Sequence, residues 1–363
     1  ESWEIMSQTD DKVLVAMSGG VDSAVAAALL LDDGYDVTGA FLCLTRDEGQ
    51  EHSRACCSPR DAADARRIAD TLGIPLITLP VSDSFGPIID DFAAEYARGR
   101  TPNPCVHCNA TIKFGRLFDV ADAVGARYLA SGHYARIVHH EGQSAIARAR
   151  GRNKDQSYAL FAVPRHRLGR ILLPIGEMEG KEQVRATARS MGLPVHDKPD
   201  SQEVCFVPDG DYASLLRSRA PDALRPGKIV NSAGEVLGSH DGYARFTVGQ
   251  RRGLKVAAGV PMYVTRIDPA TATVTIGPPD ELLACGLAAA GANWHCDVPA
   301  RFDAAIQVRY HHEATEGSVR ITSETTFEAG FVSPVPAVTP GQAAVVYDGD
   351  RLLGGGWIEG AAQ

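Results

Sequence analysis

The sequence predicts an α/β protein: a doubly wound, mostly parallel sheet, then a small central β-rich domain and a C-terminal β-barrel. Apolar strand-like segments alternate with helical segments over roughly the first 200 residues, as in a parallel sheet. After about residue 220 the pattern changes, and Pro221, Pro226 and Gly227 mark a linker. From about residue 284 short strands follow at close spacing, which favours a small barrel. We therefore expect three domains, over residues 1–219, 220–283 and 284–363.

A β-loop-α-β unit opens the chain. Residues 12–17 form a short apolar run that reads as a strand, and the loop 18–23 follows it. Residues 24–31 are rich in Ala and Leu, which are strong helix formers, and Gly34 suits the position just after a helix. Residues 35–44 read as the next strand, and this order of elements indicates a parallel sheet.

A second helix is signalled by Ser58 as N-cap, Pro59 at the first helical position and Asp61 three residues after the cap. Gly73 closes it. Its buried face is expected to hold Ala62, Ala65, Ile68, Ala69 and Leu72. Further elements are expected at residues 74–79 (strand), 112–124 (helix) and 128–131 (strand), then a hairpin from 228–231 and 235–237, and strands at 302–308, 318–322 and 343–347.

Bulk composition is that of a globular protein. The chain has 363 residues, 44% apolar and 22% charged, and no apolar run long enough to span a membrane. We expect a cytoplasmic protein without a secretory signal, with Met6 as the native start and residues 1–5 as a remnant added before it. The formal net charge of −9 argues weakly against nucleic-acid binding, but net charge does not locate charge.

The loop 18–23, Ser-Gly-Gly-Val-Asp-Ser, has the features of an anion site. Small residues after a strand let backbone N–H groups approach a phosphate, and the following helix adds its unpaired N–H groups and the positive end of its dipole. Ser18 and Ser23 are candidate donors to phosphate, and Asp22 is a candidate Mg²⁺ ligand. No Lys follows the second glycine, so this is not a Walker A loop. The alternative is an ordinary glycine-containing turn.

Two proline-containing loops carry cysteines, and Pro102 and Pro104 predict that the first of them is rigid and extended. Residues 101–109 present Cys105 and Cys108 just before the helix expected from residue 112, and a cysteine near a helix N-terminus tends to a lowered pKa. Residues 198–206 carry Cys205. The alternatives are buried inert thiols or, for the Cys105 and Cys108 pair, half of a zinc site, although a second Cys-x-x-Cys is missing. The chain has eight cysteines: Cys43, Cys56, Cys57, Cys105, Cys108, Cys205, Cys285 and Cys296.

Seven stretches in one order identify a family. The first, SGGVDS, resembles the loop of the N-type ATP pyrophosphatase (PP-loop) superfamily, whose fold is adenine nucleotide alpha-hydrolase-like. Together the seven closely resemble the bacterial tRNA-specific 2-thiouridylases, over essentially the whole chain from Val13. They are SGGVDS (18–23), TPNPC-x-x-CN (101–109), SGHYAR (131–136), KDQSY (154–158), KPDSQEVCF (198–206), GQRRGL (249–254) and PGQAAVVY (340–347).

The resemblance implies a tRNA-uridine 2-sulfurtransferase. Members adenylate the C2 oxygen of the wobble uridine in the tRNAs for Glu, Gln and Lys, using ATP with Mg²⁺, and replace it with sulfur from a cysteine desulfurase or sulfur carrier. Cys108 matches the family's nucleophile and Cys205 the persulfide carrier, with a transient bond between them. Nucleotide contacts carry over to Ala16, Met17, Ser18, Gly19, Gly20, Val21, Asp22, Ser23, Leu42 and Gly132.

The position of Cys105 departs from the family, because many members have an acid there. Any carboxylate role is therefore in doubt. An alternative mechanism follows, in which Cys105, Cys108 and Cys205 hold a [4Fe-4S] cluster whose free iron binds the incoming sulfide. It would replace the persulfide role and leave the overall reaction unchanged.

RNA recognition needs basic groups and stacking surfaces. Arg148, Arg150, Arg152 and Lys154 are spaced by two, so in a strand they would share one face; a solvated charged edge is the alternative. The resemblance places Asn103, Pro104 and Cys105 at the target base, which is expected to be flipped into the site. It also implies RNA contacts for His133, Lys154, Asp155, Gln156, Arg309, Tyr310 and Gln342.

Two rival functions remain open from the sequence. One is another adenylating PP-loop synthetase that acts on a small molecule, which would not need Cys108 and Cys205. The other is a metal-stabilised RNA-binding protein without catalysis, which predicts bound zinc and no ATP consumption.

Overall fold

The computed structural model describes residues 11–43, 59–199, 204–207, 210–256 and 259–362. The chain divides into two compact units. Unit 1 comprises Glu1–Gly86, Cys105–Asp209 and Asp350–Leu352; unit 2 comprises Pro87–Pro104, Gly210–Gly349 and Leu353–Gln363. The predicted boundaries after residues 219 and 283 remain predictions. The expectations about Met6, Cys56, Cys57 and the Ser58 N-cap lie outside the described residues.

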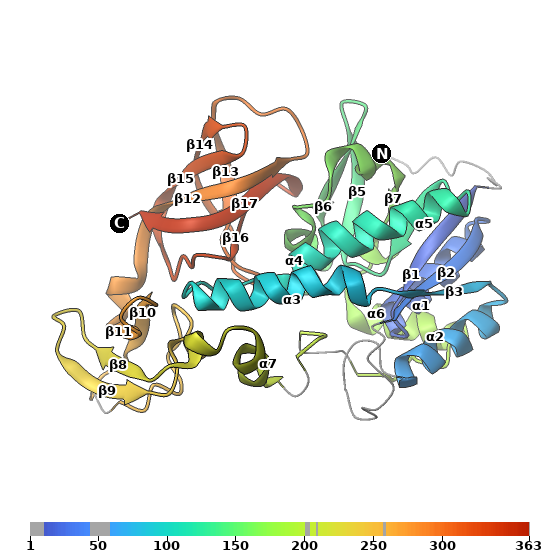
Figure 1. The fold of residues 1–363 in the computed structure, drawn as a ribbon. Helices are drawn as coiled ribbons and strands as arrows, with labels where there is room; N and C mark the ends of the chain where they lie inside the picture. The colour runs from blue at the N-terminus through green and yellow to red at the C-terminus, as the bar shows by residue number, and fades with distance from the viewer. Residues whose placement is uncertain (1–10, 44–58, 200–203, 208–209, 257–258, 363) are drawn as a thin grey trace. The chain divides into compact units, whose positions relative to one another are not determined.

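A five-stranded parallel sheet forms the centre of unit 1 (Figure 1). Its strand order is β3-β2-β1-β4-β7. The chain adds β2 and β3 on one side of β1 and then β4 and β7 on the other side, so the order reverses at β1. The register places Ala16 beside Ala40 on one side and beside Ser131 on the other. This confirms the predicted doubly wound class. The strands are β1 (Lys12–Met17), β2 (Asp36–Cys43), β3 (Leu76–Pro80), β4 (Tyr128–Ser131) and β7 (Ile171–Leu172).

Helices α1 (Val21–Asp32), α2 (Pro59–Leu72) and α6 (Lys181–Ser190) share one hydrophobic core with β1 and β2. Helix α1 buries nearly every residue from Val21 to Leu30. A helix that is buried on nearly all sides needs apolar residues around its whole surface, which explains why α1 is rich in Ala. Helix α2 buries Ala65, Ile68 and Ala69 as predicted. It also buries Asp64, an acid that the apolar pattern does not predict.

The helix predicted over residues 112–124 is longer and less regular than expected. It begins at Pro104 as α4 (Pro104–Cys108), continues as the π-helix η1 (Asn109–Arg116) and ends as α5 (Leu117–Ala123). Pro104 suits a helix start because its missing N–H has no helical partner there anyway. The cysteines therefore lie on a helix and not on the extended loop that the two prolines predict.

A hairpin of β5 (Ala135–His140) and β6 (Gln143–Arg148) follows β4. The expectation that Arg148, Arg150, Arg152 and Lys154 share a strand face is wrong. Strand β6 ends at Arg148, and residues Arg152–Lys154 form the 3₁₀ turn η2. Unit 1 also contains the 3₁₀ turns η3 (Ser157–Leu160), η4 (Arg165–Arg170) and η5 (Pro174–Glu177).

In unit 2 a four-stranded sheet has the order β10-β11-β8-β9. The predicted hairpin is confirmed as the antiparallel pair β8 and β9. Most of α3 (Ser82–Ala97) belongs to this unit, where Tyr96 stacks on Tyr212 of α7. The elements are α7 (Tyr212–Arg219), η7 (Pro221–Leu224), β8 (Gly227–Val230), β9 (Val236–His240), η8 (Tyr243–Arg245), β10 (Tyr263–Asp268), β11 (Thr273–Gly277) and η9 (Pro279–Leu282).

The C-terminal barrel is confirmed. Its strands follow the order β12-β15-β14-β13-β16-β17, and β12 pairs with β17 to close it. Alternating inward residues such as Ala304 and Ile306 build its core. The strands are β12 (Leu283–Trp294), β13 (Arg301–Gln307), β14 (Thr315–Ser323), β15 (Thr326–Pro336), β16 (Ala343–Asp348) and β17 (Arg351–Ala362). Within the described ranges, no helix is both long and apolar enough to cross a bilayer.

Candidate active site

The loop between β1 and α1 is shaped by its own serines and glycines. Gly19 has φ +70°, and a Cβ there would lie 2.4 Å from the carbonyl oxygen of Asp61, so only glycine fits. The Ser23 hydroxyl donates to the carbonyl of Gly20 at 3.1 Å and accepts from the Ser18 N–H at 3.1 Å. Ser23 is buried and Ser18 is exposed. Ser23 therefore holds the loop in shape, and Ser18 is the serine that faces solvent.

The loop lies at the carboxyl edge of the parallel sheet, where β1 and its neighbours end. Gly132 follows β4, and a Cβ on it would meet the backbone of Asp22 and Ser23 at 2.6 Å. Ala16 and Leu42 lie near the carboxyl ends of β1 and β2. The predicted nucleotide contacts thus come from three adjacent strands at the point where strand order reverses, which is where open α/β sheets bind ligands.

Asp22 already has two partners in this structure. The ammonium of Lys181 donates to both carboxylate oxygens, at 2.9 and 2.8 Å, and the hydroxyl of Tyr134 donates to Oδ1 at 2.7 Å. The side chain of Lys181 is 14% exposed and that of Asp22 31%. The Lys181 ammonium therefore contacts the Asp22 carboxylate, which the sequence predicts as a Mg²⁺ ligand.

Lys198 joins the loop to α2. Its ammonium donates to the Gly19 carbonyl at 2.9 Å and to carboxylate oxygens of Asp61 and Asp64 at 2.6 Å each. Burial lowers the pKa of Lys198, but the two carboxylates outweigh burial and raise it above its ordinary value. Burial likewise raises the pKa of Asp64, yet hydrogen bonds from Lys198 and Arg67 hold it below its ordinary value. Both groups stay charged at neutral pH.

The two cysteines of the TPNP stretch differ in exposure. Cys105, in the first turn of α4, is exposed, and Cys108, at its last residue, is 9% exposed. Asn109 follows directly and is buried, and its side-chain N–H donates to the carbonyl of Ala159 at 2.9 Å. This bond ties the helix that carries Cys108 to the turn Ser157–Leu160 of the KDQSY stretch.

Cys205 is half-buried and lies beside an aromatic anchor. The ring of Phe206 is buried and meets the ring of Phe85 edge-on, with centroids 6.3 Å apart. The residues that the structure describes, with all three cysteines among them, contain no group of three or more His, Cys, Asp or Glu side chains able to hold a metal ion. Cys105, Cys108 and Cys205 therefore do not fit the ligand set of an iron–sulfur cluster here.

His133 is a buried, neutral histidine. Its Nδ1 lies 2.8 Å from the Ser131 hydroxyl, and its ring is 5.7 Å from that of Phe114 in η1. Burial, and secondarily the charge of Lys113, hold the pKa of His133 well below its ordinary value. It can therefore offer a hydrogen bond to RNA but no positive charge at neutral pH.

Asp155 and Gln156 are used inside the protein. The Asp155 carboxylate accepts from the Ala149 N–H at 2.8 Å and the Ser157 hydroxyl at 2.8 Å, and pairs with Arg148. Gln156 accepts from the Tyr134 N–H at 2.9 Å and so supports the tyrosine that reaches Asp22. These two predicted RNA contacts thus build the loop, while Lys154 is the last residue of η2.

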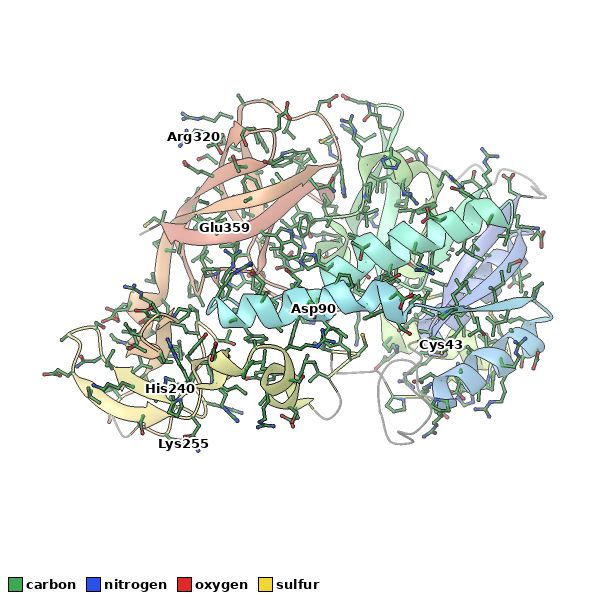
Figure 2. All side chains as sticks on the ribbon, viewed as in Figure 1. Cys43, Asp90, His240, Lys255, Arg320 and Glu359 are labelled. Carbon is green, nitrogen blue, oxygen red and sulfur yellow. The ribbon has the colours of Figure 1, made fainter. Side chains whose placement is uncertain are left out.

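Gln342 holds the loop before α4. Its side-chain N–H group donates to the carbonyls of Thr101 at 3.0 Å and Pro102 at 3.2 Å, and the Thr101 N–H donates to the Pro340 carbonyl at 2.9 Å. The late PGQ residues therefore clamp the stretch that contains Asn103 and Pro104. Close by in sequence, Arg100 pairs with Glu359. Figure 2 labels Glu359 on β17.

Arg309 and Tyr310 lie just past β13 in unit 2, where Arg309 is exposed. The Tyr310 ring lies 3.9 Å from that of His311. Among the arginines of the other basic stretch, Arg148 pairs with Asp155 and Arg150 with Glu179. The third, Arg152, pairs with Asp350.

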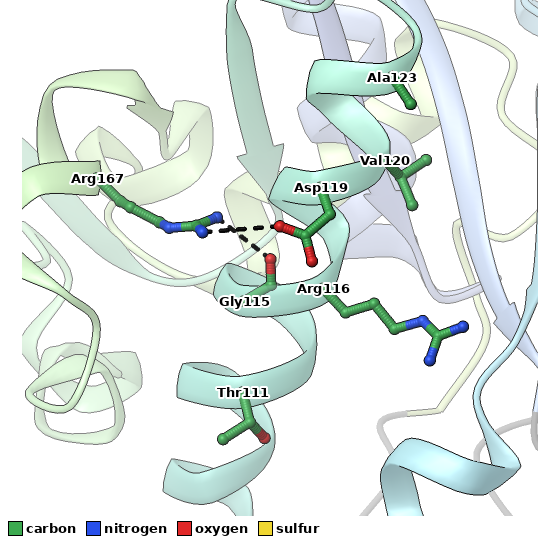
Figure 3. A pocket seen from close by; sticks show the side chains of 7 residues that line it. All are labelled: Thr111, Gly115, Arg116, Asp119, Val120, Ala123 and Arg167. Atoms are coloured by element: carbon green, nitrogen blue, oxygen red, sulfur yellow. Dashed lines mark hydrogen bonds and ion pairs between the residues drawn. The ribbon is translucent and has the colours of Figure 1, made fainter.

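A hollow along η1 and α5 does not include the phosphate loop or the cysteines (Figure 3). Arg167 crosses it, donating to the Gly115 carbonyl at 3.3 Å and pairing with Asp119 at 3.7 Å. Its basic groups are thus partly neutralised. The lining residues are Thr111, Gly115, Arg116, Asp119, Val120, Ala123 and Arg167.

Sequence reasoning missed Tyr134, Lys181 and Lys198 as parts of this site. They lie 112, 159 and 179 residues from the loop residues that they contact. Lys181 has a weak local signal, because a cation at the first residue of a helix opposes the helix dipole unless an anion is near. Lys198 and Tyr134 stand inside recognised stretches, but nothing local assigns them their partners.

The parallel sheet with its reversal at β1, and the glycine loop at its carboxyl edge, define a nucleotide-binding α/β protein of the PP-loop class. Three family models match in order along the chain. They are a tRNA methyl transferase HUP domain over residues 11–209, a tRNA methyl transferase PRC-barrel domain over 214–278 and an aminomethyltransferase β-barrel domain over 285–358.

Full-length relatives are more specific. The tRNA-specific 2-thiouridylase MnmA of Rhodopirellula baltica is 46% identical, with 96% of each chain covered. That of Carboxydothermus hydrogenoformans is also 46% identical, with 96% of this chain and 97% of the relative covered. The chain belongs to the tRNA-specific 2-thiouridylase family.

A solved structure described as a 4-thiouridine synthetase–RNA complex with bound ATP is a distant match. It is 14% identical, with a TM-score of 0.37, and the match covers 60% of this chain and 52% of the other. A likeness of this size carries no argument about the present chain.

Proposed function

We propose that this protein catalyses the ATP-dependent 2-thiolation of the wobble uridine in the tRNAs for Glu, Gln and Lys. The observation that carries the proposal is that unit 1 contains the phosphate loop together with Cys108 and Cys205. A small-molecule synthetase of the same class would need the loop alone. Family membership supports the same substrate.

The first step is activation of a poor leaving group. The uridine C2 oxygen attacks the α-phosphorus of ATP, the bond from that phosphorus to the bridging oxygen breaks, and pyrophosphate leaves. Backbone N–H groups at the start of α1 would bind the polyphosphate, and Asp22 would hold Mg²⁺, which would supply positive charge to the phosphates. The C2 oxygen then departs as AMP.

The second step delivers sulfur. A cysteine desulfurase or sulfur carrier loads Cys205 as a persulfide, whose terminal sulfur attacks C2 and displaces AMP. The Cys108 thiolate then attacks the sulfur of Cys205, which frees the thiocarbonyl and leaves a Cys108–Cys205 disulfide. Alternatively Cys108 attacks first and releases hydrogen sulfide, which attacks C2. An external thiol restores both cysteines in either case.

The proposed RNA contacts are those that the family resemblance implies. Asn103, Pro104 and Cys105 contact the flipped base, and His133 adds a neutral hydrogen-bonding ring. Arg309 and Tyr310, which lie in unit 2, contact the tRNA. ATP, tRNA and reducing thiols occur together in the cytosol. We therefore propose that the protein acts there.

The test is thiolation by the purified full chain. With ATP, Mg²⁺, a persulfide donor and unmodified glutamate tRNA, we expect 2-thiouridine by mass spectrometry and AMP in equal amount. Cys108→Ser and Cys205→Ser should each reduce thiolation at least 100-fold and leave ATP binding intact. Cys285→Ser, an exposed cysteine of the barrel, is the matched control and should be unaffected.

Two results would overturn the proposal. One is the lack of 2-thiouridine with a competent donor and tRNA. The other is full ATP turnover by both cysteine variants on a small carboxylic substrate, which would favour a synthetase. An anaerobic absorption spectrum of the same sample tests the cluster mechanism. A visible charge-transfer band that is lost in Cys105→Ser would indicate a cluster in place of the persulfide.

A further inference from the structure

A lysine ammonium lies on the one acidic side chain of the phosphate loop. Lys181 donates to both oxygens of Asp22, at 2.9 and 2.8 Å. We propose that Lys181, which contacts Asp22 in this structure, is a polyphosphate-binding residue that donates to the β- and γ-phosphate oxygens of ATP. This inference rests on the proposed function and adds a residue that neither the seven motifs nor the family resemblance assigns.

The position of Lys181 on its helix supports a role toward an anion. It is the first residue of α6, where the positive end of the helix dipole disfavours a cation unless negative charge is close. The helix itself is fixed, because Val184 and Ala188 are buried in the core shared with α1. Only the side chain needs to move, and lysine has a flexible four-carbon stem.

Exposure lets a ligand reach the pair. The side chain of Asp22 is 31% exposed and that of Lys181 14%. Asp22 also keeps a second partner when the lysine leaves, since the Tyr134 hydroxyl donates to it at 2.7 Å and Gln156 holds the tyrosine backbone at 2.9 Å. Mg²⁺ typically takes one or two carboxylates together with substrate phosphates, so it can replace the ammonium on Asp22.

The second lysine near the loop is unsuited to this role. An ammonium has three N–H donors, and those of Lys198 bind Gly19, Asp61 and Asp64. Two of these acceptors lie on α2, outside the loop. The contacts of Lys198 join the loop to α2, whereas one partner of Lys181 is the predicted Mg²⁺ ligand Asp22. Lys198 thus fixes the loop, and Lys181 is the lysine available for exchange.

The test is calorimetric titration of the full chain with three ligands: pyrophosphate, ATP and adenosine, each with Mg²⁺ and with EDTA. We expect Lys181→Met to weaken pyrophosphate and ATP binding about tenfold or more and to leave adenosine binding unchanged. Lys181→Arg keeps the charge and should recover most of the affinity. Lys12→Met is the matched control, because Lys12 is a partly exposed lysine that pairs with Asp36.

A double variant separates phosphate contact from simple charge balance on Asp22. In EDTA, Asp22→Asn should strengthen pyrophosphate binding, and adding Lys181→Met in that background should still weaken it about tenfold. If Lys181→Met has no effect there, Lys181 serves only Asp22 and the inference is wrong. If it weakens adenosine equally, the lysine is structural and the inference is also wrong.

Failure of the proposed function is a different result. It would appear as wild-type protein that does not bind ATP or does not thiolate tRNA. If the wild type does both and Lys181→Met binds pyrophosphate normally, only the inference about Lys181 falls.

Discussion

Lys198, Gly19 and Asp64 show how single residues fix the phosphate loop. The Gly19 backbone approaches the Asp61 carbonyl so closely that no side chain fits, and the Lys198 ammonium donates to the Gly19 carbonyl. Asp64 is 3% exposed and its charge is balanced by Lys198 and Arg67. A buried carboxylate is tolerated only with such partners. The loop shape therefore depends on charges that are distant in sequence.

His133 makes a prediction about pH. Burial depresses its pKa below that of the unfolded chain, so below about pH 6.5 the unfolded chain binds a proton that the folded ring does not. The neutral, buried ring therefore costs no stability above that pH, and the free energy of unfolding decreases as pH falls below it. We expect His133→Gln to flatten the decline in unfolding free energy between pH 6.5 and 5.5 by up to about 1.4 kcal/mol per pH unit.

Denaturant unfolding of both proteins across that range provides the measurement. His139→Gln is the control, because its ring is exposed on β5 and should leave the slope unchanged. An equal slope in wild type and His133→Gln would mean that the folded ring binds a proton as readily as the unfolded one, and would contradict a neutral His133 in the folded protein.

At the scale of elements, predictability follows the range of the interactions. The β1-loop-α1 segment was predicted because an apolar run, two glycines and an Ala-rich helix are local signals. The segment from α4 to α5 was not. Its prolines suggested an extended loop, but a π-helix begins at Asn109, whose buried amide donates to the carbonyl of Ala159 fifty residues away. π-Helices commonly occur at functional sites, and this one starts next to Cys108.

The clamp on the TPNP stretch makes a prediction at this scale. Gln342→Met keeps side-chain length but removes both hydrogen bonds to Thr101 and Pro102, each worth about 0.5–1.5 kcal/mol. The stretch before α4 should loosen. We expect kcat for thiolation to fall about tenfold, with ATP affinity unchanged because the phosphate loop belongs to unit 1.

Single-turnover thiolation and ATP titration together provide the measurement. Gln143→Met, at the exposed start of β6, is the control and should behave as wild type. Wild-type turnover in Gln342→Met would show that the clamp does not position the loop. Loss of ATP binding would show instead that the change damages the fold.

For the whole molecule, order and class of the domains followed from the sequence, but the placement of charge did not. Alternating elements and then short strands predicted the sheet and the barrel. The regular spacing of Arg148, Arg150 and Arg152 suggested an RNA-binding face, whereas each is paired with an acid in the structure. Ion pairs between residues far apart in sequence leave no periodic signal, so spacing alone overestimated this basic surface.

Because the net charge is −9, we expect tRNA binding to depend on local cations, and Arg309 is one exposed candidate in unit 2. Each phosphate contact releases counterions, which lowers the slope of log affinity against log salt by about 0.7–0.9. We expect Arg309→Gln to weaken tRNA binding and to make this slope shallower by that amount between 50 and 200 mM salt.

Arg150→Gln is the matched control, because Arg150 pairs with Glu179 at 2.8 Å on the other unit. Filter binding across the salt series measures both slopes. If the two variants have equal slopes, Arg309 does not contact a phosphate, and the proposed tRNA contact of Arg309 is wrong.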